Sequence, residues 1–86
     1  MMREHSPTLA QVLATLRELW YEYPGIPVTW EIGDQLGYPS AKIVRRLHRL
    51  EAQGEVTRVG TYTWVPSDAM AACAWKVQHT HKKVAP

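Results

Sequence analysis

The sequence predicts a small α+β domain in which three helices precede a two-stranded hairpin and an additional C-terminal helix follows it. Two observations carry this prediction. Apolar residues recur at three- and four-residue steps in the first half of the chain, as on helices with one buried face. Beyond residue 54 the period falls to about two, which is typical of strands. The length of 86 residues leaves room for one small hydrophobic core.

The first helix is expected to start at one of two possible caps and to end at the pair Pro24-Gly25. Ser6 can cap its start, with Pro7 in the first helical position. Alternatively, Thr8 is the cap and Gln11, three residues later, completes a capping box. The predicted buried stripe of this helix comprises Leu9, Val12, Leu13, Leu16, Trp20 and Tyr23.

A short second helix is expected at residues 30–36, with Thr29 as its cap. The segment IPVT that leads into it is expected to be extended and to form an edge strand against the later hairpin. Gly37 suits the left-handed conformation that stops a helix.

The third helix is expected at residues 40–53, with Gly54 as its stop. Ser40 caps it, or Pro39 occupies its first turn. On a wheel of about 100° per residue, the apolar and the basic side chains occupy separate arcs. The apolar arc comprises Ile43, Val44, Leu47 and Leu50, and the cationic arc comprises Lys42, Arg45, Arg46 and Arg49.

The cationic arc contains no acidic residue, whereas a solvated helix face usually mixes both signs of charge. Like charges at this spacing repel by some tenths of a kcal/mol per pair, and a bound polyanion would relieve that repulsion. Residues 40–65 hold five basic and two acidic groups, although the net charge of the whole chain is only +2. The alternative interpretation is a solvated or protein-binding face.

The segments EVTRV and YTWV are expected to form a hairpin around Gly60 and Thr61. Glycine in the first position of a two-residue loop fits a type II′ turn. Pro66 ends the hairpin because it has no N–H for the ladder. The predicted register sets Val59 beside Tyr62, Thr57 beside Trp64, and Val56 beside Val65.

The last helix is expected at residues 68–78, with Ser67 as its cap. Residues 1–7 are expected to be an N-terminal arm and residues 79–86 a flexible tail. The apolar side of the last helix would pack on the first helix or pair with a second copy in a homodimer. Its members are Met70, Cys73, Ala74 and Val77.

The order of these elements over residues 8–66, with the string IVRRLHRLEAQGEV, resembles the winged helix-turn-helix DNA-binding domains. The resemblance concerns the end of the recognition helix and the start of the wing. It implies a DNA-binding fold without indicating a subfamily. The matching positions are Val44, Arg46, Leu47, Leu50, Glu51, Gly54 and Val56.

The resemblance implies that residues 40–53 enter the major groove of double-stranded DNA. Bases would be contacted near the N-terminal end of this helix, and phosphates or bases further along it. The wing would reach the neighbouring backbone or minor groove. The expected DNA-binding residues are Ser40, Lys42, Arg45, Arg46, Arg49, Arg58 and Thr61, with Ala41 as a further candidate.

The expected function is therefore that of a small transcriptional regulator or a phage- or plasmid-type accessory factor. The alternative is a winged-helix protein-interaction module, a subunit or an inhibitor, that uses the same cationic helix on an acidic protein surface. Most aromatic side chains are expected in the core, and Tyr38 or Tyr62 could instead stack on a base.

Other classes of function find little support in the sequence. The lone Cys73 has no basic neighbour within two positions, and no catalytic motif is present, so we expect no enzyme. His79 and His81 lack further metal ligands nearby. We expect no metal, cofactor or small-molecule ligand, no membrane span and a cytoplasmic location.

Overall fold

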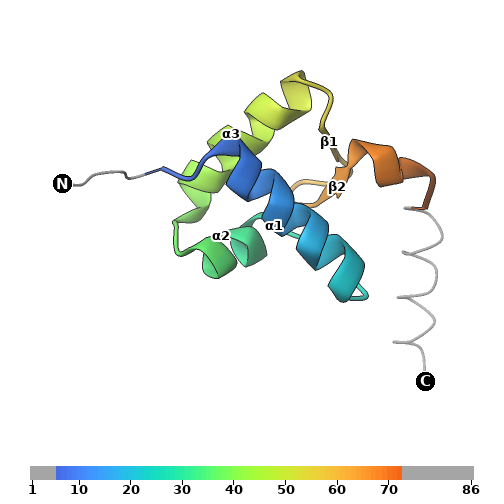
Figure 1. The fold of residues 1–86 in the computed structure, drawn as a ribbon, viewed down its shortest axis with the longest axis horizontal. Helices are drawn as coiled ribbons and strands as arrows, with labels where there is room; N and C mark the ends of the chain where they lie inside the picture. The colour runs from blue at the N-terminus through green and yellow to red at the C-terminus, as the bar shows by residue number, and fades with distance from the viewer. Residues whose placement is uncertain (1–5, 73–86) are drawn as a thin grey trace.

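The computed structural model describes residues 6–72, which form a small α+β fold of three main helices and a two-stranded antiparallel sheet (Figure 1). This arrangement confirms the predicted class and is compatible with a winged helix. Most of the predicted arm, the tail and most of the last helix lie outside the described residues. The elements are α1 (Leu9–Glu22), α2 (Thr29–Leu36), α3 (Ser40–Ala52), β1 (Val56–Arg58), β2 (Trp64–Pro66) and the 3-10 helix η1 (Ser67–Ala69).

The start of α1 confirms the capping box at Thr8. The Gln11 N–H donates to the Thr8 hydroxyl at 3.0 Å, and the Thr8 N–H donates to the Gln11 side chain at 2.9 Å. Val12 and Leu16 of the predicted stripe are fully buried. Tyr23, the last predicted member, is exposed because the helix ends at Glu22 and the backbone of Tyr23 is extended.

Three predicted helix caps are wrong, because each side chain has another position or partner. Thr29 is the first residue of α2, and its hydroxyl lies in the core against Trp64 and the carbonyl of Tyr62. Ser40 is the first residue of α3, where Pro39 occupies the cap position with an extended backbone, rather than lying in the first turn. Pro66 caps η1, and the Ser67 hydroxyl instead lies 3.1 Å from that of Thr57.

Two glycines end helices as predicted. Gly37 after α2 and Gly54 after α3 both have a φ of 81°, the left-handed conformation that favours glycine. α3 ends at Ala52, one residue before the predicted end, with Gln53 as its C-cap. The short turn between α2 and α3 sets these two helices against each other.

The hairpin register differs from the prediction by one residue. The Val59 N–H donates to the Thr63 carbonyl at 3.0 Å, so the loop has three residues, 60–62, in place of two. This register places Val56 and Trp64 on the same face of the sheet, where both are buried. The position of Gly60 in the sequence does not indicate that these two side chains must share the buried face. The observed pairs are Val56 with Pro66, Thr57 with Val65, and Arg58 with Trp64.

The extended segment before α2 pairs with the hairpin, as the sequence predicts. Val28 forms a single antiparallel bridge with Thr63. The Trp64 N–H donates to the Pro27 carbonyl at 3.1 Å, and the Thr29 N–H donates to the Tyr62 carbonyl at 3.0 Å. These bonds fix the hairpin loop beside the start of α2.

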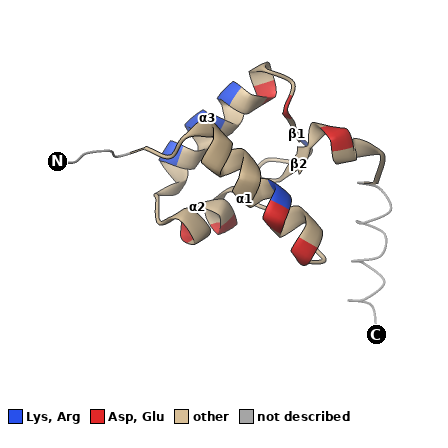
Figure 2. Ribbon diagram, viewed as in Figure 1, with Lys and Arg blue, Asp and Glu red and all other residues tan. Residues whose placement is uncertain are grey.

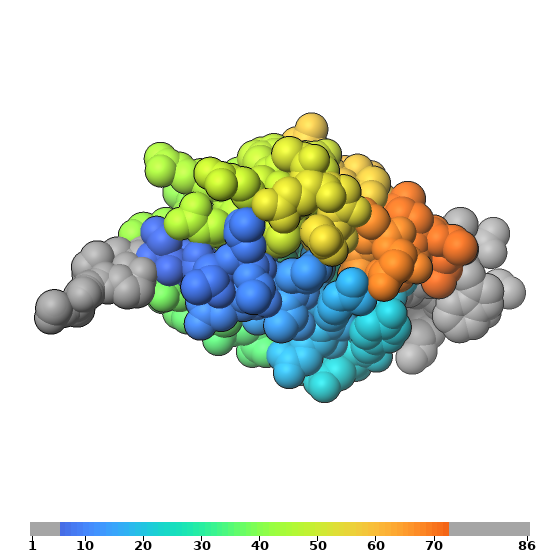
Figure 3. Space-filling view, turned by 45° about the horizontal axis from the view of Figure 1, so that its top comes forward, coloured from blue at the N-terminus to red at the C-terminus, as the bar shows by residue number. Residues whose placement is uncertain are grey.

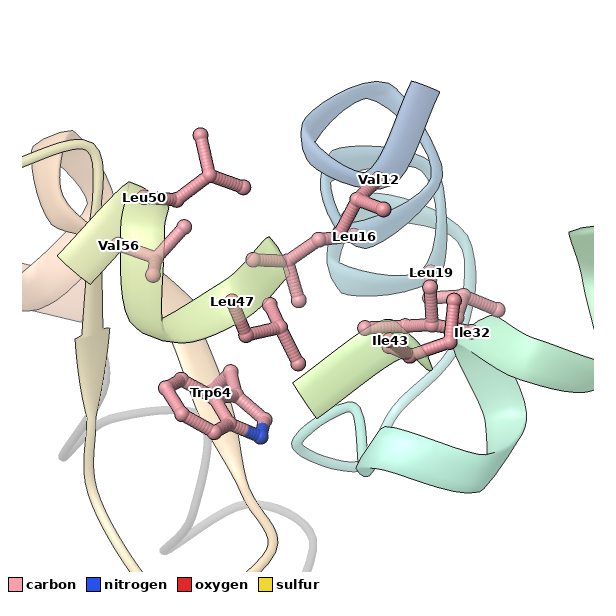
Figure 4. Close-up of a cluster of buried hydrophobic side chains, with 9 residues drawn as sticks. All are labelled: Val12, Leu16, Leu19, Ile32, Ile43, Leu47, Leu50, Val56 and Trp64. Carbon is pink, nitrogen blue, oxygen red and sulfur yellow. The ribbon is translucent and has the colours of Figure 1, made fainter. Parts of the chain in front are cut away.

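One hydrophobic cluster joins all three helices to one face of the hairpin, and Figure 4 shows its side chains converging from these elements. The other face of the hairpin is covered separately, where Val65 packs with Trp20 and Ala69. Each buried aliphatic side chain contributes about 1.5–3 kcal/mol, so the cluster fixes which side of α3 faces outward. Its members are Val12, Leu16, Leu19, Ile32, Ile43, Leu47, Leu50, Val56 and Trp64.

Replacement of Gly33 should test the close approach of α2 to the following turn. A Cβ atom at Gly33 would lie 2.6 Å from the carbonyl oxygen of Tyr38, so the backbone must shift. Gly33→Ala should lower the free energy of unfolding by about 1–3 kcal/mol, measured by urea denaturation. Gly25→Ala is the control, because a Cβ atom there meets no atom within 4 Å. Equal urea midpoints for the two variants would contradict this account.

Thr29→Val should expose the dependence of the fold on one buried hydrogen bond. The variant leaves the indole N–H of Trp64, now 2.9 Å from the Thr29 hydroxyl, without its acceptor. Because Thr29 is buried, we expect a loss of about 1–3 kcal/mol in the free energy of unfolding. Thr61→Val, at an exposed position, should change it little. A Thr29→Val protein as stable as this control would rule out the proposed contribution.

Candidate nucleic-acid interface

The exposed side of α3 carries two arginines together with small alanine side chains. Arg45 and Arg49, one helical turn apart, are exposed, and Ala41 and Ala52 lie near them on the same side of the helix. The opposite side carries the buried residues Ile43, Leu47 and Leu50. In Figure 3 the side chains of α3 stand out along the upper edge of the molecule. Both arginine side chains are therefore accessible to solvent on this side of α3.

The two exposed arginines of α3 are not used within the fold. Among residues 6–72, neither Arg45 nor Arg49 makes a side-chain hydrogen bond or an ion pair. The nearest acid along α3 is Glu51, which lies 3.4 Å from Nδ1 of His48. Both arginine side chains can therefore bind an external anion without first breaking a bond.

Arg46 has a different environment from Arg45 and Arg49. Its side chain is half-buried, and its Nε donates to the carbonyl oxygen of Pro7 at 2.8 Å. Lys42 is also half-buried and lies on the same flank of α3 as Arg46. The sequence placed four cations in one arc of this helix, and the structure divides them into an exposed pair and a flanking pair.

His48 occupies the other flank of α3, where the helix meets the hairpin. Its ring lies edge-on to Trp64, with the ring centroids 5.5 Å apart and 79° between the planes. The sequence indicated only a boundary position for His48. Its contact with Trp64 could not be foreseen, because it depends on the hairpin register.

The hairpin adds one cation on the side that faces α3. Arg58 pairs with Trp64, and directly paired residues in an antiparallel sheet point to the same face. Trp64 is buried against α3, whereas Arg58 is exposed and makes no side-chain hydrogen bond or ion pair within residues 6–72. Thr61 is exposed in the loop, and Ser40 is exposed at the start of α3.

Among the described residues, the basic side chains are concentrated on α3 and the hairpin, as Figure 2 shows, and the same region also contains Glu51 and Glu55. Of their six Lys and Arg side chains, five lie in residues 42–58, and the sixth, Arg17, forms an ion pair with Asp68 at 3.1 Å. The helices α1 and α2 carry four exposed acidic side chains, which are Glu18, Glu22, Glu31 and Asp34.

Comparison of the chain with protein-family models, curated proteins and solved structures finds no match. Within residues 6–72, no helix has the length and apolar character needed to cross a membrane. The same residues contain no group of three or more His, Cys, Asp or Glu side chains placed to hold a metal ion. His79 and His81 lie outside the described residues.

The bond between Arg46 and Pro7 predicts that Arg46 contributes to stability. Arg46→Ala should lower the free energy of unfolding by about 1–2 kcal/mol, because a charged, part-buried donor is lost. Arg45→Ala removes the same charge from an exposed position and should change stability by less than about 0.5 kcal/mol. Urea denaturation of both variants checks this difference. If Arg46→Ala unfolds at the same midpoint as Arg45→Ala, the bond contributes nothing.

Proposed function

We propose that this chain is a winged helix-turn-helix protein that binds double-stranded DNA, as a small transcriptional regulator or a phage- or plasmid-type accessory factor. The observation that supports this function most is the exposed pair Arg45 and Arg49, which has no partner within residues 6–72. The order of helix, bridge, two helices and hairpin supports the same proposal.

α3 has the shape and chemistry to enter the major groove. The groove is about 12 Å wide, and a helix with its side chains is about 10–12 Å across. The planar guanidinium group of arginine forms two parallel hydrogen bonds with phosphate oxygens or with O6 and N7 of guanine. Arg45 and Arg49 are the central contacts in this proposal, and Ser40 and Ala41 at the start of α3 lie nearest the base edges.

The remaining cations contact the backbone of the same duplex. Lys42 neutralises a phosphate on one flank of α3, and Arg58 neutralises another from the hairpin. Thr61 lies at the loop, where its hydroxyl can donate to a phosphate oxygen. Arg46 adds to the positive electrostatic potential on its flank of α3 while its Nε remains bonded to the carbonyl oxygen of Pro7.

The salt dependence of binding tests this proposal directly. If Lys42, Arg45, Arg49 and Arg58 neutralise about four phosphates, log K should fall against log salt with a slope near −3.6. Arg45→Ala combined with Arg49→Ala should weaken binding strongly and reduce the magnitude of the slope by about 1.8. Arg17→Ala is the control for loss of a single arginine elsewhere, because Arg17 is paired with Asp68 outside this surface. Fluorescence anisotropy with a labelled duplex measures all three proteins.

Two results would contradict the proposal. The first is duplex binding that does not respond to salt or that survives loss of both arginines. The second is an absence of duplex binding together with binding of an acidic protein that the double variant abolishes. The second result would establish the protein-interaction module as the function of the same face. Selection from a random duplex pool would then identify any preferred sequence and its symmetry.

A further inference from the structure

Trp30 and Tyr62 form an exposed aromatic pair where the start of α2 meets the hairpin loop. Their ring centroids lie 5.6 Å apart, with 59° between the ring planes. Trp30 is 51% exposed and Tyr62 is 55% exposed. A small domain gains most from aromatic side chains when they are buried. Two half-exposed rings in contact leave an aromatic surface that a flat ligand can cover.

The pair is held in place by bonds to the backbone of both segments. The Thr29 N–H and the Thr29 hydroxyl lie 3.0 Å and 3.3 Å from the carbonyl oxygen of Tyr62. The carboxylate of Glu31 accepts a hydrogen bond from the Val28 N–H at 3.0 Å, which fixes the first turn of α2. Because both segments are fixed, the aromatic pair is formed before any ligand binds, and little ordering is required on binding.

A continuous series of contacts connects the aromatic pair to α3. The Thr29 hydroxyl accepts a hydrogen bond from the indole of Trp64 at 2.9 Å. The ring of Trp64 contacts His48 on α3 and lies opposite Arg58 on the hairpin. Tyr62 lies in the loop of the same hairpin whose strand β1 carries Arg58, so the pair is at the loop end of the hairpin part of the surface that we propose for DNA.

The charges around the pair favour an uncharged flat ligand over a phosphate. Glu31 follows Trp30 in the chain, Asp34 lies one helical turn further, and both are exposed. Residues 60–62 of the loop carry no charge. A nucleobase offers an uncharged π face that stacks on aromatic side chains. In a closed duplex the neighbouring base pairs cover that face, so only an unpaired base is available.

We propose that Trp30 and Tyr62 stack on an unpaired base of the DNA that α3 holds. The protein then prefers a duplex with an unpaired base beside its binding site to a fully paired one. This inference rests on the proposed function and adds a second class of nucleic-acid contact to it.

Binding to two matched DNA molecules tests the inference. At one salt concentration, a duplex with a short single-stranded extension should bind about tenfold tighter than the same duplex with blunt ends. Trp30→Ala combined with Tyr62→Ala should remove this gain and leave affinity for the blunt duplex unchanged. Tyr21→Ala, which removes an aromatic ring that is 68% exposed on α1, should keep the gain.

A second variant separates stacking from stability. Trp30→Leu combined with Tyr62→Leu keeps apolar bulk at the junction without an aromatic face, and it should also lose the gain. Trp30→Phe combined with Tyr62→Phe should retain most of it. Urea denaturation of each variant confirms that the comparison is made on folded protein.

The possible failures can be told apart. Equal affinity of the natural chain for blunt and extended duplexes would overturn the stacking inference and leave duplex binding intact. If neither DNA binds, the proposed function itself fails. If the double alanine variant dissociates an oligomer seen by sedimentation and binds both DNA molecules like the natural chain, the pair is a protein contact and the inference is wrong.

Discussion

The burial of Trp64 holds together the parts from which the candidate interface is built. This side chain is 1% exposed, and its indole N–H donates to Thr29 at the start of α2. Its ring makes a T-shaped contact with His48 of α3, and its backbone N–H donates to the carbonyl oxygen of Pro27. A single residue of β2 therefore fixes the hairpin relative to two helices. The distance between the hairpin and the outward face of α3 follows from it.

The same constraint explains how a small chain can present a rigid cationic surface. α3 is held from below by three buried side chains, so its orientation does not depend on its charged residues. Arg45 and Arg49 make no side-chain hydrogen bond or ion pair within residues 6–72. Arg46, on the flank of α3, instead donates a hydrogen bond to the carbonyl oxygen of Pro7. The arginine of α3 that is bonded within the fold thus differs from the two that we propose for DNA contact.

Much of the fold follows from local features of the sequence. The capping box at Thr8 and the glycines at positions 37 and 54 set helix boundaries through contacts a few residues apart. The separation of apolar and basic side chains on α3 follows from a helical period alone. The residues of the candidate interface on α3 could therefore be named before the structure was known. Their division into an exposed pair and a flanking pair could not.

Local sequence patterns were enough to predict the order of the helices, the change to strands and the cationic face of α3, because each depends on near neighbours. The hairpin register depends instead on packing in the folded protein, because Val56 and Trp64 are buried together on one face. That register turned Arg58 toward α3 and set Tyr62 against Trp30. These contacts join residues distant in the chain, and their free energy depends on packing across the core, which no local pattern encodes.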